Sequence, residues 1–167
     1  MVDMLRRLTN LVNDHKSELV KSERDKVDVN IIYMICGFLL SSSRIIGIYR
    51  WLRPIHGVVL DMGCGQGLSF RALKLIIGDK INRTYAIGVD IFRRHLMEGK
   101  KQGTYDDVIL CDVKCLPVKS KSVETCLLLD LIEHLEKKEG LKLLVHVESI
   151  AKRQIIITTP NGFSSEF

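Results

Sequence analysis

A short apolar segment that ends in an acid and continues into three alternating glycines constrains this chain more than any other feature. It runs from Val58 to Gly67 and reads Val-Val-Leu-Asp-Met-Gly-Cys-Gly-Gln-Gly. Its apolar half is typical of a buried parallel strand, and the glycines allow a tight turn whose backbone a ligand can approach directly. Residues 68–77 are predicted to form a helix, whose N-terminal N–H groups and dipole favour a negative ligand group at the turn. The segment therefore predicts the first half of a nucleotide-binding βαβ unit.

The spacing of these glycines differs from that of the dinucleotide-binding fingerprint. The pattern Gly-x-Gly-x-x-Gly would need its last glycine at position 68, which is Leu68. The hypothesis of an NAD-dependent enzyme is weakened for this reason and is kept as a rival.

The acid and the glycines together, Asp-x-Gly-x-Gly-x-Gly, resemble the first motif of class I S-adenosylmethionine-dependent methyltransferases. The resemblance implies a Rossmann-like α/β fold and S-adenosylmethionine as the cofactor. It also implies that the turn binds this cofactor, through Asp61, Gly63, Cys64, Gly65 and Gly67.

Strands and helices alternate from Val58 onward, which predicts a parallel sheet. The second strand covers residues 85–89 and ends at Asp90, which lies 23 residues after Gly67. An acid about 20 residues past a glycine turn is placed to accept hydrogen bonds from two ribose hydroxyls. A carboxylate suits this task because both of its oxygens are acceptors. An acid in an ordinary strand-end turn is the alternative interpretation.

The third strand, residues 107–110, and the fourth strand, residues 125–129, are joined by a stretch that carries an acid and a Leu-Pro turn. Both features resemble the corresponding segments of the same family. The resemblance implies that Asp112 accepts a hydrogen bond from the adenine amino group and that Val113 offers its backbone N–H. It also implies that Ile91 lies against the face of the adenine.

The fourth strand continues into Asp130-Leu-Ile-Glu-His at the carboxyl end of a central strand, where open α/β sheets bind their ligands. We expect Glu133 and His134 to begin the next helix and to be the catalytic candidates. His134 could act as a general base, or it could merely line the pocket. It could also join Asp130 and Glu133 in holding a divalent metal, which would need a further histidine. By the resemblance, Asp130 also counts among the cofactor-binding residues.

A final helix and strand complete the predicted sheet. Apolar residues recur at helical spacing from Leu141 to Ile150, and the fifth strand, residues 154–159, ends in a Thr-Pro-Asn-Gly turn that also resembles the family. We therefore predict a doubly wound, mainly parallel sheet of about five strands, with helices on both faces and an N-terminal helical cap. The Rossmann-like domain would span residues 54–167.

Residues 1–53 form the predicted cap, which would bind the substrate or a partner. One helix is indicated by apolar residues at helical spacing up to Val20, and a second, very apolar helix by the segment from Asn30 towards Trp51. We expect the second helix to pack against the sheet or a partner, and peripheral contact with a membrane surface stays open. A membrane span is disfavoured because Arg44 in the middle of the segment would cost about 2.5 kcal/mol or more.

The family's sheet usually has seven strands, with a hairpin after the fifth, whereas here only residues 163–167 follow the last turn. The fifth strand is then expected to be an unprotected apolar edge, which tends to recruit another chain. We expect a homodimer or a partner protein at this edge. The chain could alternatively be a cofactor-binding subunit that is inactive alone.

The composition narrows the classes of partner and location. The chain is 46% hydrophobic and 27% charged with a net charge of +5, which suits a globular domain. Its basic residues are scattered and do not alternate with aromatic residues, which argues against nucleic acid as the partner. Five cysteines without zinc-site spacing, and no visible signal peptide, indicate a cytoplasmic location. The methyl acceptor is not identified by the sequence, and a small molecule is favoured.

Overall fold

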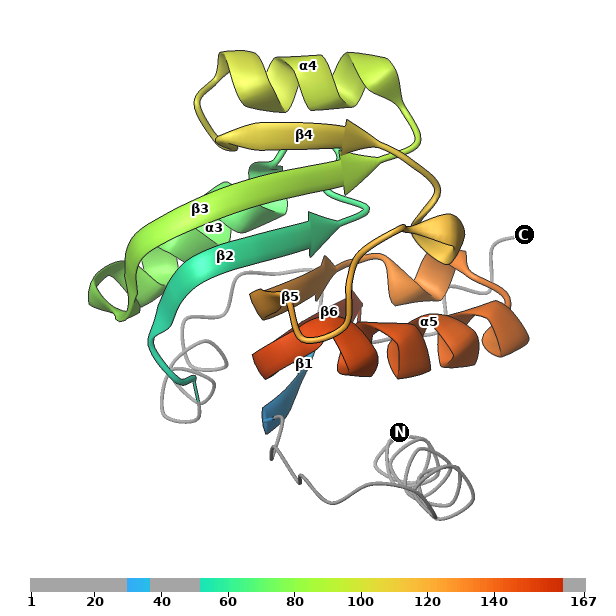
Figure 1. The fold of residues 1–167 in the computed structure, drawn as a ribbon. Coiled ribbons are helices and arrows are strands. Elements are labelled where there is room, and N and C mark those ends of the chain that lie inside the picture. Colours follow the sequence, from blue (N-terminus) through green and yellow to red (C-terminus); the bar gives the residue numbers. More distant parts are fainter. Residues whose placement is uncertain (1–29, 37–51, 161–167) are drawn as a thin grey trace.

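The computed structural model describes residues 30–36 and 52–160 and has an α/β architecture (Figure 1). Its described part contains one six-stranded sheet in the order β1-β6-β5-β2-β3-β4, and every neighbouring pair of strands is parallel. The strands are β1 (Asn30–Cys36), β2 (Ile55–Met62), β3 (Ile81–Asp90), β4 (Asp107–Leu110), β5 (Val123–Leu129) and β6 (Ala151–Pro160). The helices are α3 (Leu68–Ile77), α4 (Arg93–Lys101) and α5 (Lys137–Ile150), and the 3₁₀ turns are η1 (Gly78–Lys80), η2 (Val113–Cys115) and η3 (Ile132–His134).

The sheet is doubly wound, as the sequence predicts. From β2 the chain adds β3 and β4 on one side, and it then crosses back to add β5 and β6 on the other side. Such a reversal between β2 and β5 is the topological switch point at which open α/β sheets bind ligands, outside the carboxyl ends of their strands.

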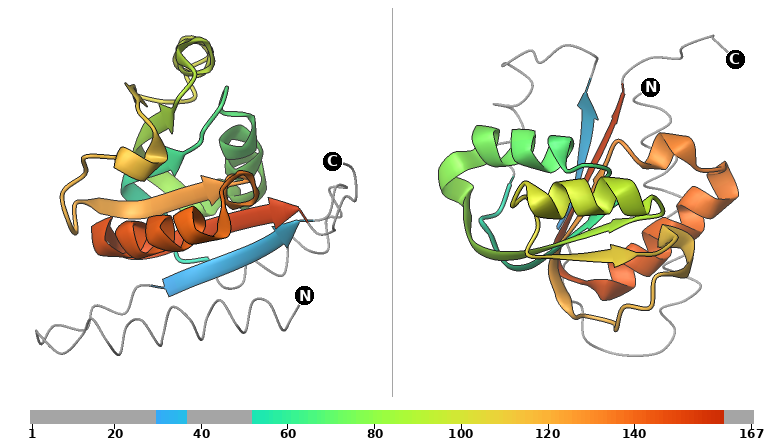
Figure 2. Two further views of the ribbon diagram at one scale, coloured as in Figure 1. Left: turned by 90° about the vertical axis from the view of Figure 1, so that its right-hand side faces the viewer. Right: turned by 90° about the horizontal axis from the view of Figure 1, so that it is seen from above.

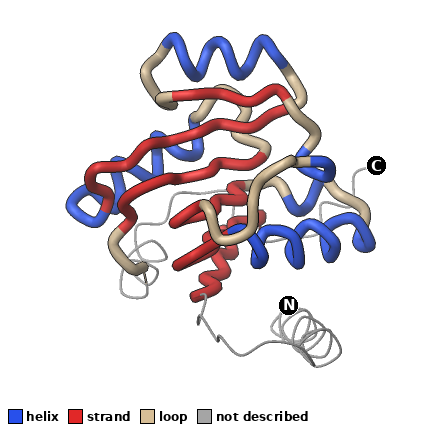
Figure 3. The backbone as a smooth tube through the Cα atoms, viewed as in Figure 1, coloured by secondary structure: helices blue, strands red, loops and turns tan. Residues whose placement is uncertain are grey.

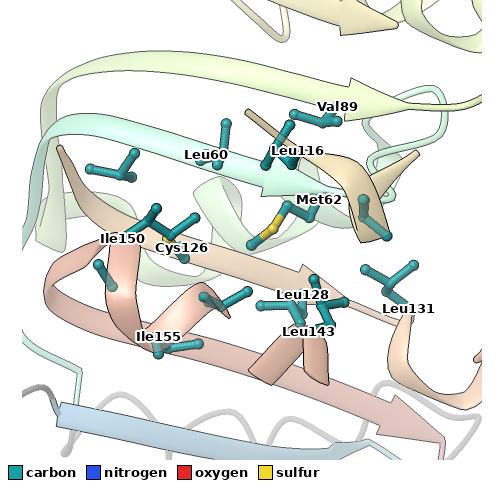
Figure 4. Packing of buried hydrophobic residues seen from close by; sticks show 14 of the residues in the cluster. Leu60, Met62, Val89, Leu116, Cys126, Leu128, Leu131, Leu143, Ile150 and Ile155 are labelled. Atoms are coloured by element: carbon teal, nitrogen blue, oxygen red, sulfur yellow. The ribbon is translucent and has the colours of Figure 1, made fainter. Parts of the chain in front are cut away.

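Two apolar clusters show that helices cover both faces of the sheet. On one face, Phe70 and Leu73 of α3 and Leu96 of α4 pack with buried strand residues. On the other face, Leu143 and Val147 of α5 pack on a second cluster, whose members include Leu60, Met62, Cys126, Leu128 and Ile155 (Figure 4). Because β5 and β6 are covered on both faces, they are apolar at consecutive positions instead of alternating.

The prediction of a helix that begins near Asn30 is wrong for residues 30–36, which form the strand β1. This strand pairs in parallel with β6, with Asn30 opposite Gln154 and Cys36 opposite Pro160. A continuous apolar run does not distinguish a buried strand from a buried helix by its periodicity, and here the free edge of β6 supplies backbone partners for a strand. Residues 30–36 therefore join the sheet instead of the predicted helical cap.

The rest of the predicted cap, residues 1–29 and 37–51, lies outside the described residues, and the boundary between residues 53 and 54 stays a prediction. The expectation that the last strand has an unprotected edge is wrong, because β1 lies along β6 (Figure 2). The expectation of a dimer or a partner protein at that edge was based on the free edge, so the structure removes the reason for it. Within the described residues, no helix has the length and apolar character needed to cross a bilayer.

Candidate functional site

The predicted site residues gather where β2, β3, β4 and β5 end and loops connect them to the following helices (Figure 3). The first of these loops is the glycine turn between β2 and α3. Gly63, Gly65 and Gly67 all have positive φ angles, of 66°, 52° and 82°, which residues with a side chain adopt only with strain. The turn is held by hydrogen bonds from Cys64 N to Val89 O (3.0 Å) and from Gly67 N to Cys64 O (2.9 Å).

The three glycines serve different steric needs. A Cβ on Gly63 would lie 2.6 Å from Leu131 Cδ1, and a Cβ on Gly67 would lie 2.6 Å from Thr104 Cγ2, so close packing excludes a side chain at both positions. A Cβ on Gly65 would meet no atom within 4 Å. The backbone at Gly65 therefore faces open space that a ligand could occupy.

Asp90 lies beside this open backbone at the end of β3, as the sequence predicts. The residue is buried, with 7% exposure. The Oδ2 atom accepts a hydrogen bond from Gly65 N, and the Oδ1 atom accepts one from Phe92 N, both at 2.8 Å. Because each carboxylate oxygen has two lone pairs, both oxygens can accept a further hydrogen bond from a ligand.

Asp61, at the end of β2, lies buried beneath the turn with 2% exposure. Its Oδ2 atom accepts a hydrogen bond from the hydroxyl of Tyr105 at 2.6 Å, whereas its Oδ1 atom has no partner among the described residues. Burial raises the pKa of Asp61 to about 7; the Tyr105 hydrogen bond opposes the rise, and the charge of Asp90 adds to it. Sequence analysis missed Tyr105, which is 44 positions away from Asp61 along the chain.

The residues that the resemblance assigns to adenine binding follow the strands β3 and β4 along the chain. Ile91 follows Asp90 with 57% of its surface exposed, so its side chain is available to a ligand. Asp112 follows β4 and accepts a hydrogen bond from Lys114 N at 2.9 Å, while Lys114 Nζ lies 3.7 Å from its other oxygen. Val113 is buried and begins η2. The positions match the prediction, and the roles of these residues towards adenine stay predictions.

Asp130 follows β5 in a left-handed conformation with φ of 55°. Its backbone N–H donates to Thr158 O and Thr158 Oγ1, at 3.1 and 2.9 Å, and the Thr158 hydroxyl donates to Asp130 Oδ1 at 2.9 Å. The carboxyl end of β6 thus fixes the loop that follows β5. Thr158 was not singled out from the sequence, because its partner lies 28 positions away along the chain.

Glu133 and His134 lie in the 3₁₀ turn η3, and α5 begins only at Lys137. The prediction that these two residues begin the helix is wrong, because they form a separate short turn ahead of it. This turn closes with a hydrogen bond from His134 N to Leu131 O at 3.0 Å. Partial burial raises the pKa of the Glu133 carboxyl, and the nearby charge of Asp130 adds to the rise.

The metal alternative finds no support in the part of the chain that the structure describes. There, no group of three or more histidine, cysteine, aspartate or glutamate side chains could hold a metal ion. Asp130, Glu133 and His134 therefore share an end of the sheet without forming such a group.

Comparisons with known proteins agree with this geometry. A protein-family model described as a methyltransferase domain matches residues 60–153, more than half of the chain. No curated protein matches the chain by sequence.

Solved structures share the fold. A SAM-dependent methyltransferase from Archaeoglobus fulgidus is 26% identical with a TM-score of 0.50, over 73% of this chain and 51% of that one. A protein from Pyrococcus horikoshii OT3 is 22% identical with a TM-score of 0.54, over 70% and 56%. The structure of the Haloferax volcanii Trm112 methyltransferase activator in complex with a methyltransferase matches with 19% identity and a TM-score of 0.51, over 65% and 46%. The chain thus spans about half the length of these structures.

Proposed function

This chain belongs to the methyltransferase domain family, and from that premise we propose that it binds S-adenosylmethionine at the glycine turn and transfers its methyl group to an acceptor. A small molecule is the favoured acceptor, and a cytoplasmic location stays a prediction. The observation that carries the proposal is the open backbone at Gly65 beside the buried carboxylate of Asp90.

The residues of the site fit this cofactor. Gly65 leaves room at the turn, and Asp90 keeps lone pairs free on both oxygens for the ribose hydroxyls. The Oδ1 atom of Asp61 is buried without a partner, which a cationic ligand nearby would compensate. Ile91 and Asp112 would contact the adenine, and Val113 would offer its backbone N–H.

The bound cofactor supplies a methyl group that is carried on a positively charged sulfur. The acceptor takes the methyl group, and the sulfur is the leaving group. The chain contributes mainly by holding the reactants in a productive arrangement. Glu133 and His134 lie after β5, at the same end of the sheet as the glycine turn. We propose that they face the acceptor, and that His134 takes the proton that the acceptor loses. If His134 only lines the pocket, its removal should leave turnover unchanged, whereas removal of a general base should lower turnover.

A cofactor-binding subunit that is inactive alone is the alternative function. It draws on two facts: the chain spans about half of the matching structures, and one of those structures contains an activator protein. Neither fact favours it over an active enzyme. The NAD-dependent alternative has no support from the comparisons, because the family model and the neighbour from Archaeoglobus fulgidus are methyltransferases.

Calorimetry with S-adenosylhomocysteine, with NADH as the comparison ligand, tests cofactor binding. We expect micromolar affinity for S-adenosylhomocysteine, or about −7 to −8 kcal/mol, and none for NADH. Absence of S-adenosylhomocysteine binding would overturn the proposal. Transfer of a radiolabelled methyl group to a panel of small-molecule, peptide and nucleic-acid acceptors then tests activity. A protein that binds the cofactor but methylates nothing, alone or extended at its C-terminus, would favour the inactive subunit.

A further inference from the structure

Tyr105, in the loop before β4, brings together three segments around the site. The residue is 4% exposed, and its ring stacks on Phe70 of α3, with ring centroids 5.7 Å apart and planes inclined by 6°. A Cβ built on Gly67, Gly88 or Gly99 would lie 3.0, 2.9 or 3.1 Å from the nearest ring atom of Tyr105. These glycines belong to the glycine turn, β3 and α4, so one ring fills the space that three missing side chains leave.

The hydroxyl of the same side chain contacts the charged part of the site. It donates to Asp61 Oδ2 at 2.6 Å. This is the one side-chain hydrogen bond that the described residues provide to the Asp61 carboxyl, because the Oδ1 atom has no partner. The other titratable groups that act on Asp61 and Tyr105 are Asp90 at the end of β3 and Cys64 in the turn.

We propose that Tyr105 is a positioning residue for the cofactor site. Its ring fixes the glycine turn against β3 and α4, and its hydroxyl keeps the Asp61 carboxylate oriented and ready for a cationic ligand. The inference rests on the proposed function, because S-adenosylmethionine and S-adenosylhomocysteine carry the ammonium group that a carboxylate beneath the turn attracts.

This role has a consequence that simple packing would not have. A hydrogen bond to a carboxylate favours its charged form, so the Tyr105 hydroxyl keeps Asp61 ionised at a lower pH than burial alone would allow. The pKa of Asp61 is about 7 with the hydroxyl in place. Without the hydroxyl, the carboxyl should ionise at a higher pH.

The test compares Tyr105→Phe, which keeps the ring and removes the hydroxyl, with the control Tyr85→Phe, which removes a hydroxyl from an exposed tyrosine of β3. Calorimetry measures S-adenosylhomocysteine affinity from about pH 6 to about pH 9, and ¹³C NMR follows the titration of the Asp61 carboxyl without ligand. Wild-type affinity should rise with pH through about 7, as Asp61 ionises. Tyr105→Phe should bind roughly tenfold more weakly near neutral pH, with both titrations displaced to higher pH, and the control should match the wild type.

The outcomes separate this inference from the proposed function. If the wild type binds no S-adenosylhomocysteine, the proposed function fails, while the NMR titration still reports whether Tyr105 acts on Asp61. If Tyr105→Phe titrates and binds like the wild type, the positioning role is refuted. An equal loss of affinity at every pH with an unchanged Asp61 titration would also refute it.

A second variant guards against misfolding of Tyr105→Phe. Gly99→Ala adds a methyl group 3.1 Å from the Tyr105 ring, so it should move the hydroxyl and displace the Asp61 titration in the same direction by a smaller amount. An unchanged titration in a folded Gly99→Ala protein would contradict the proposal.

Discussion

The carboxylate of Asp90 accepts a hydrogen bond from the backbone N–H of Gly65 across 2.8 Å, which joins the end of β3 to the glycine turn after β2. The two residues are 25 positions apart along the chain. Their strands are neighbours in the sheet, and Cys64 N reinforces the connection by donating to Val89 O. The conformation of the turn therefore depends on the same side chain that we expect to bind the ribose.

Replacing Asp90 should affect both stability and cofactor binding. Asp90→Asn has one acceptor oxygen, so it cannot accept from both Gly65 N and Phe92 N as the carboxylate does. We expect the free energy of unfolding to fall by about 1–3 kcal/mol and the affinity for S-adenosylhomocysteine to fall by about tenfold or more.

Urea unfolding and calorimetry measure the two effects. Asp107→Asn is the matched control, because Asp107 is an exposed aspartate whose ion pair with Lys100 should contribute little. Unchanged affinity in Asp90→Asn would show that this carboxylate does not bind the ligand.

The raised pKa of Asp61 predicts a stability that depends on pH. Its pKa is about 7 in the folded protein against a usual value of 3.8. Between these values the folded chain holds a proton that the unfolded chain has released, so this residue lowers the free energy of unfolding as the pH rises. The stabilising contribution is complete below pH 3.8 and is lost as the pH rises through about 7.

Asp61→Asn is neutral at every pH and should remove this dependence. We expect its stability relative to the wild type to improve from about pH 5 to about pH 8, with a slope of at most about 1.4 kcal/mol per pH unit. Urea unfolding at both pH values measures the difference. A constant difference between the two proteins would mean that Asp61 ionises normally.

Glu124 predicts the opposite dependence at the other end of the sheet. Its Oε2 atom accepts from Val58 N at 2.7 Å and its Oε1 atom accepts from Lys152 Nζ at 2.6 Å, so it joins β5 to β2 and β6. Burial raises the pKa of Glu124, but these two donors outweigh burial and hold it below its usual value of 4.5. The stabilisation is present above pH 4.5 and is lost as the pH falls through the lower, folded-state pKa.

Glu124→Gln should therefore lower the free energy of unfolding near neutral pH by about 1–2 kcal/mol and weaken the acid sensitivity. Unfolding by urea at neutral and acidic pH, with the exposed Glu136→Gln as control, checks this. Equal stability of the two variants would argue against the connection through Glu124.

The sequence predicted the features that depend on short stretches of chain. The helix over residues 68–77 and the strand over residues 107–110 have the predicted bounds, because glycine turns, apolar runs and acids mark them locally. Asp90 ends a strand and Asp112 follows one, as expected, since the alternation of strands and helices fixes which strand ends lie at the same edge of the sheet.

Features that depend on distant partners could not be predicted in this way. The strand β1 forms against a partner more than a hundred residues away, and its apolar run is compatible with a helix. The Tyr105–Asp61 and Thr158–Asp130 hydrogen bonds also join residues far apart along the chain. Only the packing of the sheet reveals them, and the two hydrogen bonds support loops whose own sequences were informative.

The catalytic candidates lead to a kinetic prediction. If His134 takes the acceptor's proton, His134→Ala should lower turnover by about 100-fold or more and leave S-adenosylhomocysteine affinity unchanged. Steady-state kinetics with an identified acceptor, with and without a metal chelator, measures this. A chelator that abolishes activity, restored by a divalent ion, would favour metal binding instead. Full turnover in both the variant and the chelated protein would leave only a pocket-lining role.

The pairing of β1 with β6 can be tested with two neighbouring proline substitutions. Ile32 lies opposite Ile156 and Tyr33 lies opposite Ile157. Successive residues of a strand direct their N–H groups to opposite sides, so only one of these two residues can donate to β6. Proline removes the donor and is tolerated only where the N–H faces away from the neighbouring strand.

We therefore expect Ile32→Pro and Tyr33→Pro to differ in the free energy of unfolding, with the more harmful substitution costing about 2 kcal/mol or more. The more harmful substitution should also expose the edge of β6, and an apolar strand edge recruits other chains. Analytical ultracentrifugation should then show association for that variant at concentrations at which the other variant sediments like the wild type. Equal behaviour of the two variants in both measurements would mean that β1 does not pair with β6.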